Sequence, residues 1–259
     1  MSTFLFNDII FGPVSSRRLG SSLGINLLPA GLKVCTFNCI YCECGWTCNR
    51  NLPDSEFPPR HIVKKALQDR LLELKEYSVI PDAITYAGNG EPTLHPDFEG
   101  IVDDSISIRD EMSPESRIVV LSNGSLSHRE NVKRALLKVD QNILKLDTGI
   151  EDTFRALNQP PEEWKLQNII NNLKSFNGKL IIQTLFIRGE FRGKKIDNTT
   201  REEIGELLKL YREIKPSEVM VYTIARDTPI RGLERIPYDE LKSIAAEIEA
   251  IGINTQVSG

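Results

Sequence analysis

Short apolar segments alternate with amphipathic segments along the chain. Strand-like runs rich in β-branched residues occupy 22–28, 82–88, 117–124, 141–147, 179–187, 217–225 and 253–258. Between them, apolar side chains recur at helical spacing at 60–77, 97–112, 127–139, 151–157, 162–176, 199–214 and 238–252. Ser127 is the expected N-cap of the third of these helices, and a threonine is the expected cap of the helix over 199–214.

The alternation of strand and helix, repeated about six times with short connections, predicts a parallel sheet covered by helices. We find no repeat or linker that divides the chain, so we expect an α/β fold and a single domain over residues 1–259. An open doubly wound sheet and a complete or partial barrel remain alternatives, because periodicity does not distinguish them. In each of them ligands bind at the carboxyl ends of the strands, so polar clusters that directly follow a strand are the candidate sites.

Composition and charge narrow the functional classes. The chain has 259 residues, 40% hydrophobic content and a net charge of −4, which is ordinary for a globular protein and argues against a basic nucleic-acid-binding surface. Two local basic stretches, 15–18 and 188–195, are compatible with phosphate contacts, and Arg17 and Arg18 could anchor an anionic small substrate. No apolar run approaches the roughly 20 residues that span a bilayer. Residues 1–13 lack a signal-peptide pattern, so we expect a folded N-terminus, a cytoplasmic location and no membrane partner.

All five cysteines lie between Cys35 and Cys48, which indicates a metal-binding loop (residues 30–48) rather than a disulfide framework. Cys35, Cys39 and Cys42 are spaced so that one loop can wrap a cluster face. Three ligands on a four-iron cluster leave one iron open for chemistry. The alternative is a structural zinc site formed by Cys39, Cys42, Cys44 and Cys48. If the metal is held by the first three cysteines, Cys44 and Cys48 are spare thiols, a catalytic nucleophile, or ligands of something further.

The segment 35–42 (CTFNCIYC) resembles the CxxxCxφC signature of the radical S-adenosylmethionine (SAM) superfamily, in which φ is aromatic and is here Tyr41. The resemblance implies a 4Fe–4S cluster on Cys35, Cys39 and Cys42, SAM bound to the open iron, and Tyr41 near the adenine. It also implies a partial (β/α)6 TIM-like barrel with this loop after the first strand. The implied reaction is reductive cleavage of SAM to a 5′-deoxyadenosyl radical that abstracts hydrogen. A donor such as flavodoxin or ferredoxin would supply the electron.

Further strand-end motifs extend the resemblance to the SAM contacts. Glycines let a backbone approach a ligand closely, and a carboxylate can accept from an ammonium group. Lys145 and Asp147 share one face of their strand, and the alternative for them is an ion pair that only neutralises two buried charges. By resemblance, the contacts to the SAM amino group, ribose, carboxylate and adenine fall on Gly88, Asn89, Gly90, Glu91, Ser122, Asn123, Lys145, Asp147, Ile224 and Ala225.

Segments 11–29, 88–98, 121–125, 144–149 and 183–189 together resemble the subgroup that includes wyosine-base synthases of transfer RNA. Those enzymes carry further cluster cysteines outside the signature loop, and this chain has none, so their substrate is not carried over. A small molecule, a peptide or protein, and tRNA remain the possible substrate classes of an iron–sulfur enzyme of oxidoreductase or lyase type. The competing hypothesis is a non-catalytic zinc or iron–sulfur protein that binds a partner.

Overall fold

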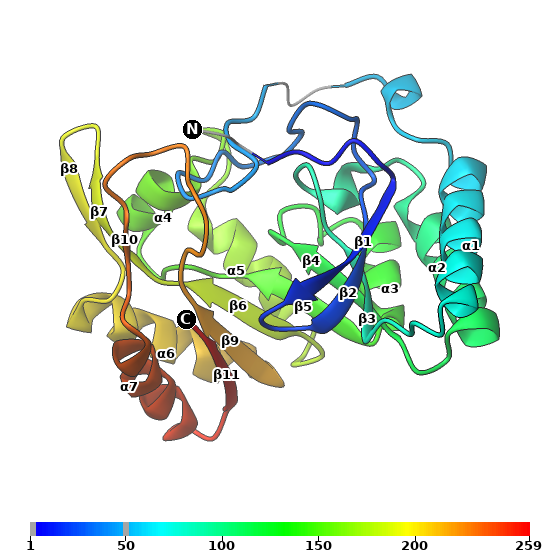
Figure 1. The fold of residues 1–259 in the computed structure, drawn as a ribbon. Coiled ribbons are helices and arrows are strands. Elements are labelled where there is room, and N and C mark those ends of the chain that lie inside the picture. Colours follow the sequence, from blue (N-terminus) through cyan, green and yellow to red (C-terminus); the bar gives the residue numbers. More distant parts are fainter. Residues whose placement is uncertain (1–3, 49–51) are drawn as a thin grey trace.

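The centre of the fold is a curved eight-stranded sheet with the strand order β1-β2-β3-β4-β5-β6-β9-β11 (Figure 1). The computed structural model describes residues 4–48 and 52–259. The strands of this sheet are β1 Ile10–Ser16, β2 Gly20–Ile25, β3 Ala83–Tyr86, β4 Arg117–Ser122, β5 Gln141–Lys145, β6 Ile181–Leu185, β9 Glu218–Tyr222 and β11 Asn254–Ser258. Every neighbouring pair from β2 to β11 is parallel, and β1 pairs with β2 in the antiparallel direction.

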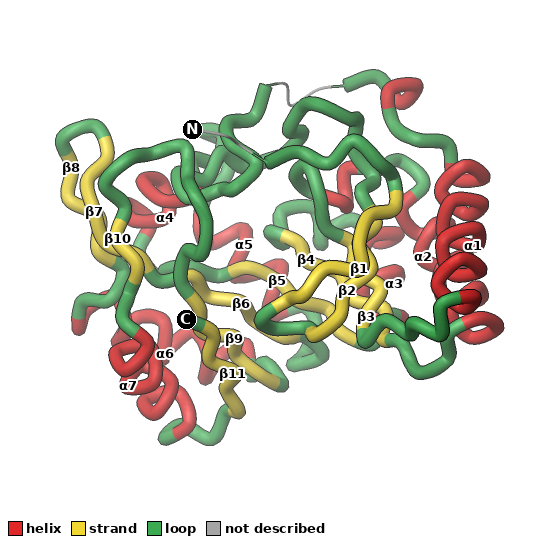
Figure 2. Tube along the Cα trace, viewed as in Figure 1, coloured by secondary structure: helices red, strands yellow, loops and turns green. Residues whose placement is uncertain are grey.

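Helices connect the parallel strands and cover the outer side of the curve (Figures 1 and 2). They are α1 Arg60–Glu76, α2 Phe98–Met112, α3 Glu130–Lys138, α4 Glu151–Asn158, α5 Leu166–Lys174, α6 Arg201–Ile214 and α7 Tyr238–Glu249, with short 3₁₀ turns at Asp54–Glu56 and Pro92–Leu94. In α1 the buried residues are Val63, Leu67, Leu71 and Leu74, so one apolar stripe packs inward. No helix within the described residues is long and apolar enough to cross a membrane.

The predicted α/β fold is confirmed as a partial (β/α)6 barrel, because the parallel strands β2 to β11 curl around one side and are linked by helices. The sheet has β1 and β11 at its two edges. The cysteine loop follows β2, the first of the parallel strands, as expected.

Two features of the fold did not follow from the hydrophobic pattern. The first is β1, whose sequence is interrupted by Gly12 and Pro13 and so lacks an apolar alternation. The second is a small sheet with the order β10-β7-β8, built from β7 Ile187–Phe191, β8 Lys194–Asp197 and β10 Glu234–Arg235. Most of its residues are charged, and only Ile187 and Ile196 are buried, so no continuous apolar face marks these strands in the sequence.

The predicted helix caps had different outcomes. Thr200 caps α6, since its side chain accepts from the Glu203 amide at 3.3 Å, as expected. Ser127 does not cap α3: its hydroxyl donates to the Gly124 carbonyl at 2.8 Å, and the helix begins only at Glu130. A serine hydroxyl satisfied within a preceding turn is no longer free to cap the helix that follows.

The inner face of the sheet is apolar toward the amino ends of the strands and polar toward their carboxyl ends. Toward the amino ends, Leu19, Ala83, Val119, Ile143, Ile181 and Met220 form a small apolar cluster. Two residues further along the same faces, Lys145 of β5 pairs with Gln183 of β6, and Tyr222 of β9 pairs with Leu185, which is four residues beyond Ile181. The carboxyl ends of the strands therefore open onto polar side chains, while the amino ends are closed by apolar packing.

Candidate active site

A cavity of about 290 Å³ lies at the carboxyl ends of the strands and collects most of the predicted site residues. On its wall are Cys35, Cys39, Tyr41, Cys42, Gly88, Gly90, Glu91, Ser122, Asn123, Lys145 and Ile224. Asn89, Asp147 and Ala225 are not on the wall. Asn89 and Asp147 are buried behind it, and Ala225 is exposed.

The cysteine loop is held to the barrel on both sides by backbone hydrogen bonds. On one side the Val34 amide donates to the Asn89 carbonyl at 2.8 Å, and the Glu91 amide donates to the Val34 carbonyl at 3.0 Å. On the other side the Asn38 and Ile40 amides donate to carbonyls at the end of α4, both at 3.0 Å. The loop is thus an ordered wall of the cavity.

Gly90 makes the hydrogen bonds between Val34 and residues 89–91 possible. Its φ is +137°, and a Cβ at this position would lie 1.9 Å from the Val34 carbonyl oxygen. An L side chain is disfavoured both by this backbone conformation and by the approach of the cysteine loop. The glycine is therefore required by the meeting of two loops.

The cysteines differ in their surroundings. Cys35 and Cys39 are buried, Cys42 is partly buried, and all are free thiols. Burial raises the pKa of Cys35 to about 12. Side-chain amides face two of the sulfurs: Asn123 lies 3.5 Å from Cys35 Sγ, and Asn158 lies 3.5 Å from Cys39 Sγ.

Cys44 and Cys48 lie in different surroundings. The Cys44 thiol donates to the Gly88 carbonyl at 3.2 Å and lies on the cavity wall. Cys48 is exposed, and its sulfur lies 3.8 Å from the Trp46 carbonyl. Within residues 4–48 and 52–259, no three His, Cys, Asp or Glu side chains are gathered as ligands for a single metal ion.

Lys33 is a buried cation behind the cysteines that the sequence reasoning missed. Its side chain is 2% exposed, lines the cavity and donates to the Gly45 carbonyl at 2.8 Å. Burial by itself lowers the pKa of this ammonium group, but the neighbouring Cys42, Cys35 and Cys39 raise it above its ordinary value. The only signal in the sequence is a lysine between Leu32 and Val34, where an apolar residue would be expected.

Glu91 ties the glycine loop (residues 88–91) to the end of β4. One carboxylate oxygen accepts from the Thr93 amide at 3.1 Å, the Thr93 hydroxyl at 2.6 Å and the Ser122 hydroxyl at 2.8 Å. The other accepts from the Asn123 amide at 2.8 Å. Burial raises the pKa of Glu91, while these donors favour the charged form. The result is a fixed acceptor on the cavity wall.

Asp147 is held by neighbouring side chains behind the cavity. It accepts hydrogen bonds from Tyr41 and from Asn158, the latter at 2.8 Å, and its other oxygen accepts from the Leu185 amide at 3.0 Å. Lys145 lies 3.6 Å from Asp147, so the two charges form the same-face ion pair that was one of the alternatives. Burial disfavours charge on Lys145, but Asp147, Tyr222 and Cys39 together outweigh that effect and raise the pKa of the lysine.

A further cation and its supports come from distant strands. Arg18 lies in the turn between β1 and β2, with its guanidinium 4.4 Å from the centre of the Tyr222 ring. It also donates to the Gln183 side chain at 2.8 Å. The Tyr222 hydroxyl in turn accepts from Lys145 at 3.0 Å. Gln183 and Tyr222 escaped prediction because they read as ordinary strand residues, and Asn158 because it falls at a helix end.

Comparisons with known proteins agree with this arrangement. The sequence model described as the Radical SAM superfamily matches residues 32–194. The chain is 31% identical over 245 residues to a protein named GTPase Obg of Brachyspira hyodysenteriae, covering 93% of this chain and 33% of that protein. It is 32% identical over 227 residues to a UPF0026 protein of Methanocaldococcus jannaschii, covering 86% of this chain and 64% of that protein. The chain thus spans a third of the first relative and under two thirds of the second.

Solved structures share the fold at low sequence identity. A radical SAM methyltransferase from Sphaerobacter thermophilus aligns with a TM-score of 0.66 and 16% identity, over 92% of this chain and 65% of that one. SuiB of Streptococcus suis bound to S-adenosylmethionine gives 0.62 and 17%, over 90% and 50%. A TYW1 structure with a lysine–pyruvate adduct gives 0.60 and 16%, over 88% and 73%. With the family model covering more than half of its residues, this chain belongs to the radical SAM superfamily.

Proposed function

We propose that this chain holds one 4Fe–4S cluster through Cys35, Cys39 and Cys42 and cleaves S-adenosylmethionine reductively. The observation that carries the proposal is the meeting of three free cysteines from one ordered loop on the wall of a cavity at the carboxyl ends of parallel strands. Members of the superfamily are enzymes, and membership implies SAM and an iron–sulfur cluster. When bound, a cluster with one open iron supplies the electron that breaks the SAM sulfonium bond and releases a 5′-deoxyadenosyl radical.

The donor set of the loop fits such a cluster. Thiolates are the ligands that iron–sulfur clusters use, and N–H groups near the sulfurs tune their charge. Asn123 and Asn158 supply amide groups beside two of the cysteine sulfurs. Lys33 supplies a buried positive charge that offsets the negative charge of the thiolates.

The rest of the cavity wall fits the polar parts of SAM. Glu91 is a fixed acceptor for the amino group, and Gly88 and Gly90 allow the backbone to approach it. Lys145 is a cation for the carboxylate, beside Ser122 and Asn123 for the ribose hydroxyls. The proposed adenine contacts are Tyr41, Ile224 and Ala225, while Asn89 and Asp147 act from behind the wall by positioning the loops.

Replacing Lys33 by methionine should make the reduction potential of the cluster more negative. Loss of a buried positive charge beside the thiolates disfavours the reduced, more negative state, by on the order of 50–100 mV. An EPR-monitored redox titration of the reconstituted protein measures the midpoint. Lys33→Arg keeps the charge and is expected to keep most of the potential. A fully loaded Lys33→Met protein with the wild-type midpoint would contradict this electrostatic role.

Replacing Glu91 by glutamine should weaken SAM binding by about tenfold or more, because a neutral amide no longer accepts strongly from an ammonium group. Calorimetric titration of the reconstituted protein with SAM measures the change. Glu218→Gln is the matched control, since Glu218 lies at the amino end of β9, away from the cavity wall. Equal SAM affinity of Glu91→Gln and wild type would remove Glu91 from the binding site.

The test of the proposed function is anaerobic reconstitution with iron and sulfide, reduction with dithionite, and chromatography for 5′-deoxyadenosine after SAM is added. Formation of that product with about four irons per chain supports the proposal. A protein that retains one tightly bound zinc and takes up no cluster overturns it. Four irons without product make calorimetric SAM binding the deciding measurement, and absence of binding then overturns the SAM part.

The hydrogen donor is a small molecule, a peptide or protein, or tRNA, and the reaction is of oxidoreductase or lyase type. We further propose a cytoplasmic enzyme of one domain that receives its electron from flavodoxin or ferredoxin. The proposed substrate pocket continues from the cluster side toward Arg18, Gln183 and Tyr222, which bring a guanidinium, an amide and a phenol to the same cavity. These groups favour a substrate with an anionic or polar end.

A further inference from the structure

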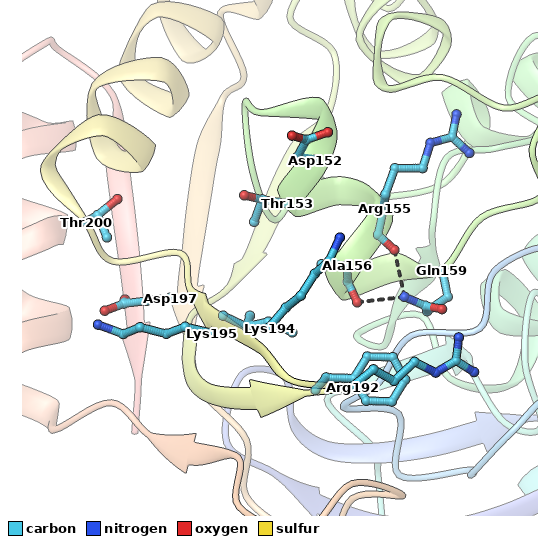
Figure 3. A pocket seen from close by; sticks show the side chains of 12 residues that line it. Asp152, Thr153, Arg155, Ala156, Gln159, Arg192, Lys194, Lys195, Asp197 and Thr200 are labelled. Carbon is cyan, nitrogen blue, oxygen red and sulfur yellow. Dashed lines mark hydrogen bonds between the residues drawn. The ribbon is translucent and has the colours of Figure 1, made fainter.

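A second cavity, of about 600 Å³, lies between α4 and the β7–β8 hairpin (Figure 3). The hairpin follows β6 with one intervening residue, so it rises from the carboxyl edge of the sheet on which the candidate active site lies. The end of α4 that borders this cavity, at Ala156 and Gln159, directly adjoins the residue pair 157–158, whose carbonyls hold the cysteine loop. The two cavities are therefore neighbours on either side of the end of α4.

The lining of this second cavity is rich in cations. Arg155 is already engaged, since it donates to Glu151 at 2.8 Å and to the Pro161 carbonyl at 3.0 Å. Arg192, Lys194 and Lys195 come from the hairpin, and within the described part of the chain none of them forms an ion pair. Figure 3 shows the Lys194 side chain extending across the cavity toward α4.

The carboxylates at this cavity do not neutralise these cations. The Asp197 carboxylate forms an ion pair with Arg188, with 3.3 Å between nitrogen and oxygen, and accepts a hydrogen bond from the Thr199 hydroxyl at 2.7 Å. Asp152 is exposed on the first turn of α4. Three cations without carboxylate partners thus share a concave surface in a chain whose net charge is −4. The Thr200 hydroxyl is a further donor, and this combination suits a phosphate oxyanion.

Aromatic side chains connect this cavity to the cysteine loop. Phe191 lines the cavity and stacks on Trp46 of the cysteine loop, with ring centres 6.1 Å apart and 30° between the planes. The Arg192 guanidinium lies 5.0 Å from the centre of the Phe191 ring. Trp46 is 40% exposed, so a flat group bound next to the cavity can stack on it.

We propose that the cavity between α4 and the β7–β8 hairpin binds the phosphate of a ligand, with Lys194, which extends across the cavity, as its main contact and Lys195 as a second positive charge from the same strand. The phosphate belongs to a phosphomonoester of a small molecule or to a phosphodiester of single-stranded RNA. That this ligand is the substrate rests on the proposed function, because Trp46 and the end of α4 lead from the phosphate to the cluster site. Phosphate binding itself does not depend on the cluster.

The test uses the full chain, reconstituted with its cluster, and calorimetric titration with two probes: ribose 5-phosphate and a single-stranded hexaribonucleotide. In Lys194→Ala/Lys195→Ala, we expect at least about tenfold weaker binding of the probe that binds wild type. The matched control, Lys65→Ala/Lys209→Ala, removes the same charge from exposed positions on α1 and α6 and should bind like wild type.

The source of the phosphate follows from the probe that binds and from Trp46→Ala. If RNA is the ligand, loss of stacking lowers its affinity by about tenfold, and the effect of salt is strong. If a phosphomonoester is the ligand, ribose 5-phosphate binds and responds to the lysine variant. Failure of both probes to bind wild type, or equal weakening by the lysine variant and its control, overturns the proposal.

Iron content and 5′-deoxyadenosine formation are measured on the same samples. A wild-type protein that takes up no cluster yet binds the probe through Lys194 and Lys195 overturns the proposed function and leaves the phosphate site standing. A protein that forms 5′-deoxyadenosine but binds neither probe overturns the phosphate site and leaves the proposed function standing. The two proposals therefore fail separately.

Discussion

Alanine at Cys39 should abolish cluster assembly and, with it, the cleavage of SAM. Cys39 is buried on the cavity wall and faces the amide of Asn158, so its loss removes one of the three thiolates that the cluster needs. Iron and sulfide analysis after anaerobic reconstitution should fall from about four per chain to a small residual fraction. Chromatography should then detect no 5′-deoxyadenosine above background.

Cys48→Ala is the matched control for this experiment. Cys48 belongs to the same loop, but it is exposed: its sulfur lies 3.8 Å from the Trp46 carbonyl, and its backbone amide, which alanine keeps, donates to the Lys33 carbonyl. We expect wild-type iron content and product from this variant. If Cys39→Ala assembles a full cluster, the proposed ligand set is wrong. If Cys48→Ala and Cys39→Ala both fail to hold metal, the zinc-type set of Cys39, Cys42, Cys44 and Cys48 becomes the better assignment.

Alanine at Gly90 should have the second largest effect, on both stability and the site. The added Cβ meets the Val34 carbonyl at 1.9 Å, and the φ of +137° is unfavourable for any L residue. We expect the free energy of unfolding to fall by roughly 3 kcal/mol, as measured by urea denaturation. The bridge between Val34 and Gly90 cannot form in its present geometry, so cluster uptake should fall as well.

Gly205→Ala separates this effect from the general cost of replacing a glycine. Gly205 lies inside α6, and a Cβ there meets nothing within 4 Å. Because alanine favours the helix, we expect this variant to gain about 0.5–1 kcal/mol in stability with unchanged cluster content. A Gly90→Ala protein as stable as wild type would show that the two loops can separate without cost.

The hydrophobic pattern was sufficient for a parallel sheet covered by helices, because most of the parallel strands are buried on both faces, whereas the choice of a partial barrel over an open sheet came from the resemblance. The strands β3 and β6 are buried at every position, and such short apolar runs are readable without a structure. The hairpin β7–β8 carries mostly charged residues and has no continuous apolar face, so its pairing is set by the turn and by β10. The basic run 188–195 accordingly looked like a loop.

The site could be predicted where a motif is local and not where it is assembled from separate strands. The cysteine spacing and the glycine loop are each continuous in sequence, and both reach the cavity. Lys33, Gln183 and Tyr222 come from three places in the chain: the register of the sheet brings Gln183 near Tyr222, and Lys33 reaches the same cavity with the cysteine loop. Asp147 was expected to face the ligand, but the side chains of Tyr41 and Asn158 lie against it instead.

The backbone hydrogen bonds that hold the cysteine loop have a consequence for how the protein acquires its metal. A loop that becomes ordered only upon metal binding spends part of the binding free energy on lost conformational entropy. Here Val34, Asn38 and Ile40 are already bonded to the glycine loop and to α4 by contacts that involve no ligand. These bonds restrict the loop, so under the proposed function less of the free energy of cluster binding is lost to ordering the ligands.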